Sequence, residues 1–190
     1  MFNYVNTYIS KIHKIFGGSQ LNNTILFLLK PFSLIPMLLM MYIIFSFSAQ
    51  TGDDSSKLSH NVTYKIVSTA DELLDLQLSD SQINRCINKI HHYIRKIAHF
   101  SEYFLLAATV SLPLYVYGIR GFWLILTAGI ICIGFAVLDE MHQLFVQNRS
   151  GSYKDVIIDS LGSITGIIFV RLFGYIIRKT IIEPLCKLFH

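Results

Sequence analysis

The sequence predicts an all-α integral membrane protein, a bundle of about four transmembrane helices. Composition is the first observation: 53% of the 190 residues are hydrophobic and 15% are charged, whereas soluble domains carry about 25% charged residues. The second is a set of four apolar segments, each long enough at about 20 residues to cross a hydrocarbon core. The third is that polar or amphipathic segments flank these runs. The chain therefore forms one membrane domain.

This transmembrane domain is predicted over residues 31–178, and its spans are the four apolar runs at 32–49, 97–117, 122–145 and 156–177. The first span begins after Lys30 and Pro31, because a proline interrupts the helix that precedes it. A tight turn from Gly118 to Gly121 joins the second and third spans. No repeat or low-complexity tract is present.

Three further segments lie outside the apolar runs. Residues 1–30 are basic, with hydrophobic residues at helical spacing, which suits a helix lying on the membrane surface; an unstructured basic tail is the alternative. Residues 51–95 are polar with balanced charges, and residues 179–190 form a basic tail. Ser79 and Gln82 form a capping-box signal before an isoleucine stripe, so an amphipathic interfacial helix should run into the second span. The stripe consists of Ile83, Ile87, Ile90, Ile94 and Ile97.

The distribution of basic residues predicts the orientation of a multi-pass protein of the cell membrane. Short segments rich in lysine and arginine stay in the cytoplasm. The N-terminal segment, the turn with Arg120 and the C-terminal tail carry such residues and lie on one side of a four-span protein. Both termini are therefore expected in the cytoplasm, with residues 51–95 and 147–154 outside.

Composition also narrows the partners and the chemistry. The net charge of +4 matches the basic excess of a membrane protein, so the bilayer is the expected partner and nucleic acid is not. The three cysteines show neither a zinc-site spacing nor a disulfide framework. Sequence signatures of serine hydrolases, nucleotide-binding loops and dinucleotide-binding folds are absent.

Alternating helix directions should gather the polar residues of all four spans at the outer face. Ser48 and Gln50 close the first span, and Asp139, Glu140, His142 and Gln143 close the third. Lys96, His99, Glu102 and Tyr103 lie near the start of the second span, and Asp155 and Asp159 near the start of the fourth. An ionisable residue within a span is a functional-site hypothesis by default, because its insertion costs several kcal/mol.

Some of these residues have a structural alternative. Asp155 would complement the dipole in the first turn of its helix. Asp139 and Glu140, at the end of a helix, face an unfavourable dipole and therefore favour a functional role. Arg149 could pair with these acids or bind a ligand. Gly162 and Gly166 form a small-residue stripe that lets another helix approach closely.

Two kinds of chemistry fit the polar residues. Crowded carboxyl groups can act as an acid and a base, with Glu102, Asp139, Glu140 and Asp159 as the acidic core. His99 and His142 would then carry protons or bind ligands. The same groups could hold a divalent metal, but no standard metal motif is present and no cofactor is evident.

The order and spacing of these motifs resemble the VanZ-like family of small bacterial membrane proteins, over roughly residues 35–175. The resemblance rests on Lys96-x-x-His99-Phe100-x-Glu102-Tyr103, Asp139-Glu140-x-His142-Gln143, Arg149-Ser150-Gly151-Ser152, and Asp155 with Asp159-x-x-Gly162-x-x-x-Gly166. Ser48-x-Gln50 also resembles the family pattern. Many members have Pro-Gly where this chain has Gln147-Asn148, and Asn also tolerates turn conformations. The resemblance implies a link to the cell envelope and to resistance against the glycopeptide teicoplanin.

These observations lead to a ranked set of functions. The first is a protein that acts at the extracytoplasmic face on cell-envelope properties, including teicoplanin susceptibility, with Lys96 and Arg149 binding an anionic lipid headgroup or a lipid-linked envelope precursor. Tyr103, Gln143, Asp155, Ser48 and Gln50 would complete that ligand site. The alternatives are a non-catalytic protein that binds a headgroup or a partner, and a small proton-coupled transporter. Four spans make a thin bundle, so a homodimer is compatible with the sequence.

Overall fold

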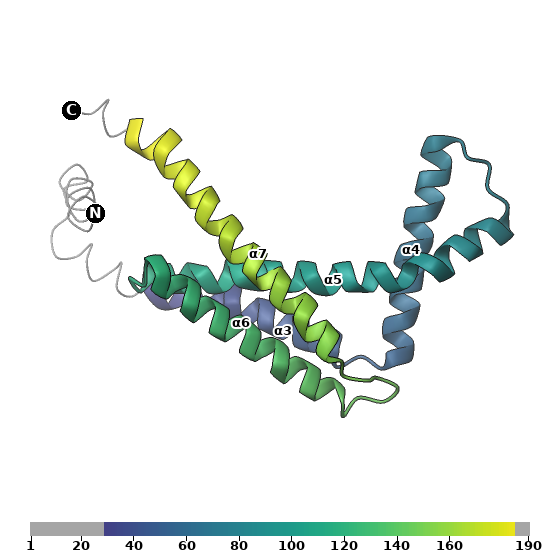
Figure 1. The fold of residues 1–190 in the computed structure, drawn as a ribbon, viewed down its shortest axis with the longest axis horizontal. Coiled ribbons are helices and arrows are strands. Elements are labelled where there is room, and N and C mark those ends of the chain that lie inside the picture. The colour runs from purple at the N-terminus through teal and green to yellow at the C-terminus, as the bar shows by residue number, and fades with distance from the viewer. Residues whose placement is uncertain (1–28, 185–190) are drawn as a thin grey trace.

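The computed structural model describes residues 29–184, and within this range every secondary-structure element is a helix (Figure 1). Four helical stretches are long and apolar enough to cross a membrane: Lys30–Ser48, Asp80–Val116, Gly121–Gln143 and Tyr153–Ile181. They confirm the predicted all-α membrane bundle. The predicted surface helix near the N-terminus lies outside the described residues, as does the second half of the basic C-terminal tail.

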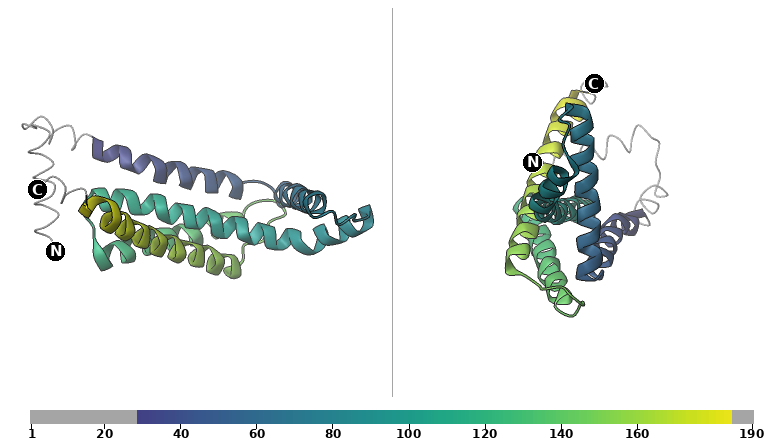
Figure 2. Two further views of the ribbon diagram at one scale, coloured as in Figure 1. Left: turned by 90° about the horizontal axis from the view of Figure 1, so that it is seen from above. Right: turned by 90° about the vertical axis from the view of Figure 1, so that its right-hand side faces the viewer.

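Each predicted span has a counterpart in the order of helices. The 3-10 helix η1 (Lys30–Leu34) leads into α3 (Ile35–Ser48), and α4 (Gly52–Leu74) follows. The long helix α5 (Asp80–Val116) then precedes α6 (Gly121–Gln143) and α7 (Tyr153–Ile177), which ends in the π-helix η2 (Arg178–Ile182). In Figure 2, α3, α5, α6 and α7 run roughly along one direction, so they form the bundle.

Helix α5 is the centre of the bundle and contacts α3, α4, α6 and α7. Its 37 residues give it a length of about 55 Å, more than one bilayer requires. The capping box predicted at Ser79 and Gln82 is present at its first turn. The hydrophobic core forms where α5 meets its neighbours: Ile44, Tyr103, Leu106, Ala107, Val110, Ala128, Cys132, Ala136 and Ile167 are buried there.

Helices α5 and α7 pack closely because two glycines of α7 lie at their contact. A Cβ atom added at Gly162 would collide with the carbonyl oxygen of Phe100, and one at Gly166 would lie 2.5 Å from the carbonyl oxygen of Phe104. Both positions therefore require glycine at this helix separation. The contact brings the first half of α7, with its aspartates, against α5.

Helix α4 has no counterpart in the sequence analysis, which assigned no helix to residues 51–78. It crosses α5 at a steep angle at one end of the bundle (Figure 1). Thr51 caps its first turn by accepting a hydrogen bond from the backbone of Asp54. Its buried positions include Gly52, Ser59 and Thr63, which are small or polar. No hydrophobic stripe marks this face, so the helical pattern stayed hidden.

Candidate functional site

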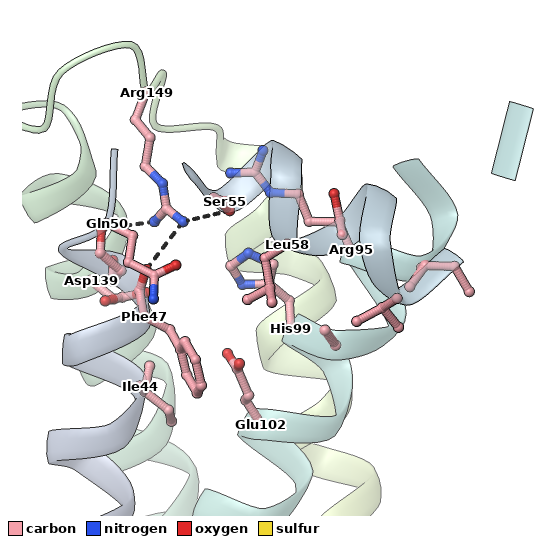
Figure 3. A pocket seen from close by; sticks show the side chains of 15 residues that line it. Ile44, Phe47, Gln50, Ser55, Leu58, Arg95, His99, Glu102, Asp139 and Arg149 are labelled. Carbon is pink, nitrogen blue, oxygen red and sulfur yellow. Dashed lines mark hydrogen bonds between the residues drawn. The ribbon is translucent and has the colours of Figure 1, made fainter. Parts of the chain in front are cut away.

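A cavity of about 230 Å³ opens where α3, α4, α5 and α6 meet at one end of the bundle (Figure 3). The C-terminal ends of α3 and α6 and the N-terminal end of α7 lie at this end, together with the segments that follow α3 and α6 (Figure 1). Its lining residues are Ile44, Phe47, Ser48, Gln50, Ser55, Leu58, Ser59, Val62, Ile94, Arg95, Ala98, His99, Glu102, Asp139 and Arg149. The cavity therefore combines apolar walls with charged groups of both signs.

His99 and Asp159 form a pair between α5 and α7. The Nδ1 atom of His99 lies 3.6 Å from a carboxylate oxygen of Asp159, whose side chain is 0% exposed. Neither carboxylate oxygen of Asp159 has a hydrogen-bond partner among residues 29–184. The close α5–α7 contact at Gly162 holds the backbones that carry these two side chains together.

Helix α5 presents one face to the cavity, on which Arg95, His99 and Glu102 follow one another at helical spacing. In Figure 3 the side chain of His99 lies between those of Arg95 and Glu102. Arg95 makes no hydrogen bond or ion pair with any residue in the range 29–184. Tyr103 is instead turned into the core, fully buried, with a hydroxyl that has no partner.

Helix α6 contributes Asp139 at the opposite side of the cavity (Figure 3). This side chain is 3% exposed, and one of its oxygens accepts a 3.2 Å hydrogen bond from the amide of Gln143 one turn later. The other oxygen is buried without a partner. Gln143 therefore orients Asp139 and leaves half of its hydrogen-bonding capacity unused.

Arg149 holds the ends of α3 and α4 together at the rim of the cavity. Its guanidinium donates hydrogen bonds to the carbonyl oxygens of Ser48 (2.8 Å) and Phe47 (3.3 Å) and to the hydroxyl of Ser55 (3.0 Å). Burial lowers the pKa of Arg149 from its usual value, and nearby Arg95 lowers it further. An arginine nevertheless stays protonated in a protein, so the cavity rim keeps a fixed positive charge.

Glu140 and the loop after α6 form a separate structural unit. A carboxylate oxygen of Glu140 accepts a 2.8 Å hydrogen bond from the backbone of Ser152, which is the N-cap of α7. A Cβ atom at Gly151 would lie 2.6 Å from the carbonyl oxygen of Glu140. The Arg149–Ser152 motif thus connects α6 to α7 at close range, with Arg149 aimed toward α3.

The structure gathers some of the predicted site residues and leaves others apart. Ser48, Gln50, His99, Glu102, Asp139 and Arg149 line the cavity, and Asp159 lies behind His99. Lys96 does not line it. His142 stacks on Phe45, with ring centroids 4.6 Å apart. Asp155 lies in the first turn of α7, where it complements the helix dipole.

Arg95 and the α4 residues are lining groups that the sequence analysis missed. Arg95 lies four residues before His99 and Lys96 lies three residues before it. On a helix, either spacing places the basic residue on the same face as His99. Only the position of α4 decides which basic residue faces the cavity. The α4 residues could not be assigned without recognising that helix; they are Ser55, Leu58, Ser59 and Val62.

A metal-binding group is also absent from the described part of the chain: nowhere in it do three or more histidine, cysteine, aspartate or glutamate side chains come together in a suitable arrangement. The carboxylates are spread around the cavity and behind it. The site therefore has positively charged arginine side chains at the cavity and a histidine–aspartate pair deeper inside.

The fold and this site define a multi-pass membrane protein with a polar cavity at one end of its helical bundle. The family model for VanZ/LLP1 matches residues 32–174, so the chain belongs to the VanZ family, which is linked to glycopeptide resistance. The matched region runs from η1 to α7 and contains every cavity residue. Neither a curated protein nor a solved structure matches the chain.

Proposed function

We propose that the cavity binds the anionic headgroup of a membrane lipid or of a lipid-linked envelope precursor at the extracytoplasmic face. Occupancy would then alter cell-envelope properties, including glycopeptide susceptibility. The observation that carries this proposal is the pair of arginines at the cavity: Arg95 and Arg149 both line it, and neither has an acidic partner within 4.0 Å among residues 29–184.

The guanidinium groups of Arg95 and Arg149 repel each other. Asp139 and Glu102 line the same cavity but form no ion pair with either arginine among residues 29–184, so an anion that contacts both arginines would offset the repulsion directly. Arginine presents a planar set of donors that matches a phosphate or carboxylate group. Arg149 keeps its Nε donor unused and buried. Arg95 keeps all of its donors, so it is the stronger candidate to contact the ligand directly.

The apolar walls of the cavity favour a lipid over a soluble anion. Phe47, Leu58 and Val62 line it, and each is more than 40% exposed in the structure. Leu58, Val62 and Ile66 follow one another at four-residue intervals along α4 and form an exposed apolar stripe. Such a stripe suits a helix at the membrane–water boundary, with acyl chains on one side.

The orientation of the site is part of the proposal. Arg120, Arg171, Arg178 and Lys179 lie at the end of the bundle away from the cavity, as the order of the helices requires. The rule that basic residues stay in the cytoplasm assigns that end to the inside and the cavity to the outside. Cysteine accessibility at Thr69, exposed on α4, and at Tyr117, in the turn after α5, would test this assignment in intact cells. We expect labelling by a membrane-impermeant maleimide at position 69 alone.

Binding can be measured with purified protein and a short-chain, micelle-free phosphatidic acid as the probe. We expect saturable binding by the wild type and a loss of at least about tenfold in affinity for Arg95→Gln, since one charge-assisted contact contributes about 1.5–3 kcal/mol. Arg85→Gln is the matched control, because Arg85 is an exposed arginine on the same helix outside the cavity. Equal affinity of all three proteins would contradict the proposal.

The cellular consequence is tested by susceptibility to teicoplanin beside vancomycin, at matched membrane levels of each variant. We expect protection by the wild type and by Arg85→Gln, and loss of protection by Arg95→Gln. Protection that survives in Arg95→Gln would separate the phenotype from the cavity.

A further inference from the structure

We propose that the cavity also hydrolyses a phosphate ester of the lipid headgroup, with His99 as general base and Glu102 as proton donor. This inference rests on the proposed function, which brings an anionic headgroup to the same cavity. It adds a reaction to the binding step. Three features carry it: the orientation of His99, the unsatisfied carboxylate behind it, and the position of Glu102.

The two ring nitrogens of His99 have different surroundings. Nδ1 is buried and faces Asp159 at 3.6 Å. Nε2 makes no hydrogen bond within residues 29–184 and is not among the buried atoms, while the side chain lines the cavity. A carboxylate on one nitrogen fixes the tautomer and leaves the other nitrogen as an acceptor. Nε2 is therefore placed to take a proton from a group inside the cavity.

No hydrogen bond to the side chain of Asp159 among residues 29–184 explains its burial. Its side chain is 0% exposed, and both oxygens lack hydrogen-bond partners. It lies beyond the first turn of α7, so the helix dipole contributes little to its stability. A buried carboxylate without donors is costly, and a positively charged imidazole is the one neighbour here that would offset the cost. Asp159 is thus a positioning residue that favours protonated His99 after proton transfer.

Glu102 completes the arrangement from the same helix. It follows His99 by three residues, so the two side chains leave α5 on one face, and both line the cavity. Its carboxylate makes no hydrogen bond and is not fully buried, in contrast to that of Asp139. A carboxyl group crowded by other carboxylates can hold a proton, and a proton held there can pass to a leaving group.

The reaction uses only water as a second substrate. The oxygen of a water molecule forms a bond to phosphorus while the bond between phosphorus and the ester oxygen breaks. His99 Nε2 accepts the proton of the water, and the carboxylic acid of Glu102 gives its proton to the departing alcohol oxygen. Arg95 and Arg149 stabilise the charge on the remaining phosphate oxygens. Solvent then returns the proton from His99 to Glu102, so the products are a phosphate and an alcohol.

The test uses full-length protein in vesicles of phosphatidylcholine that contain either phosphatidic acid, a monoester, or phosphatidylglycerol, a diester. The reaction runs in ¹⁸O-labelled water, and mass spectrometry follows the label into the phosphate product. We expect labelled product from the wild type with at least one lipid. His99→Gln should lose at least about 100-fold in turnover, whereas its affinity for short-chain phosphatidic acid should stay within about threefold of the wild-type affinity. His92→Gln is the control, because His92 is exposed on the same helix outside the cavity.

Asp159→Asn gives a second readout that a purely structural residue would not change. We expect the pH profile of its remaining turnover to move, because the imidazolium of His99 loses its carboxylate partner. No labelled product from the wild type, with binding intact, would overturn the hydrolysis and leave the proposed function standing. A wild-type protein that does not bind short-chain phosphatidic acid would overturn both the hydrolysis and the proposed function. Turnover of soluble p-nitrophenyl phosphate without turnover of either lipid would overturn the assignment of a lipid substrate.

Discussion

The arginines at the two ends of the bundle are satisfied in different ways. At the end away from the cavity, the guanidinium of Arg120 lies 3.3 Å from the centre of the Tyr115 ring and donates to the carbonyl oxygen of Ile119. Arg171 donates to the carbonyl oxygen of Gly121. Arg178 pairs with Glu183 at 3.4 Å. Each arginine there is used by the fold itself.

At the cavity end, Arg95 has no partner within the described range, and the carboxylates of Asp139 and Asp159 keep buried oxygens without donors. Leaving such groups unsatisfied costs stability, because each loses its contact with water. Apart from Arg149, which the fold binds at three acceptors, the cavity end therefore keeps charged groups unsatisfied, and the proposed ligand would meet them there.

The largest expected effect comes from removing one arginine at each end. Arg149→Ala should abolish headgroup binding and lower the free energy of unfolding by about 2–3 kcal/mol, because three hydrogen bonds from a charged donor are lost. Arg120→Ala should leave binding unchanged and cost about 1 kcal/mol. Binding isotherms and thermal melts in detergent measure both. Equal losses of binding would show that the two ends do not differ in this way.

The second prediction is that a substitution at a buried position increases stability, whereas most such substitutions decrease it. Asp159→Asn should raise the free energy of unfolding by about 1–2 kcal/mol, since a buried carboxylate that accepts no hydrogen bond among residues 29–184 and faces His99 only at 3.6 Å becomes a neutral amide. Stability gained at the expense of function is expected where a site holds unsatisfied groups. Thermal melts give the stability, and the teicoplanin assay gives the function.

Asp155→Asn is the matched comparison within the same helix. Asp155 complements the dipole in the first turn of α7, so its neutralisation should lower stability by a few tenths of a kcal/mol. If both variants lowered stability, the charge interaction of Asp159 with His99 would outweigh the cost of burying the carboxylate.

The four spans could be predicted from the sequence because the hydropathy of a segment largely determines whether it enters a bilayer. Helix α6 begins at Gly121, one residue before the predicted start, and the capping box fixed the start of α5. The gathering of His99, Glu102 and Asp139 followed from alternating helix directions. These inferences needed only length, periodicity and topology.

The site residues that the sequence analysis missed are placed by tertiary packing, which the sequence pattern does not reveal. Helix α4 buries mostly small and polar residues and leaves its apolar stripe exposed, so hydrophobic periodicity did not mark the face that packs on α5. The choice between Arg95 and Lys96 depends on where α4 crosses α5, since both residues are one turn from His99. Glu140 looked like a site carboxylate because of its place beside Asp139, whereas its bond to Ser152 also gives it a role in the loop.

The third prediction separates Glu140 from the cavity carboxylates. Glu140→Ala should cost about 1–2 kcal/mol, because the N–H of Ser152 loses its acceptor. Glu140→Gln should recover most of this loss, since an amide oxygen also accepts a hydrogen bond. The measurement is the thermal melt together with teicoplanin protection, which Glu140→Gln should keep and Glu102→Gln, if it removes the proton donor, should lose.

The smallest expected effect lies in the loop that positions Arg149. Asn148 has a φ of 57°, in the left-handed region, and its side chain donates a 2.9 Å hydrogen bond to Asp53. Asn148→Gly relieves the backbone and loses that bond, so stability should change by less than about 0.5 kcal/mol. Asn148→Ala loses the bond and keeps the backbone conformation, at a cost of about 1 kcal/mol. Thermal melts distinguish the two, and equal losses for the two variants would mean that the contact with Asp53, rather than the turn, holds Arg149 at the cavity rim.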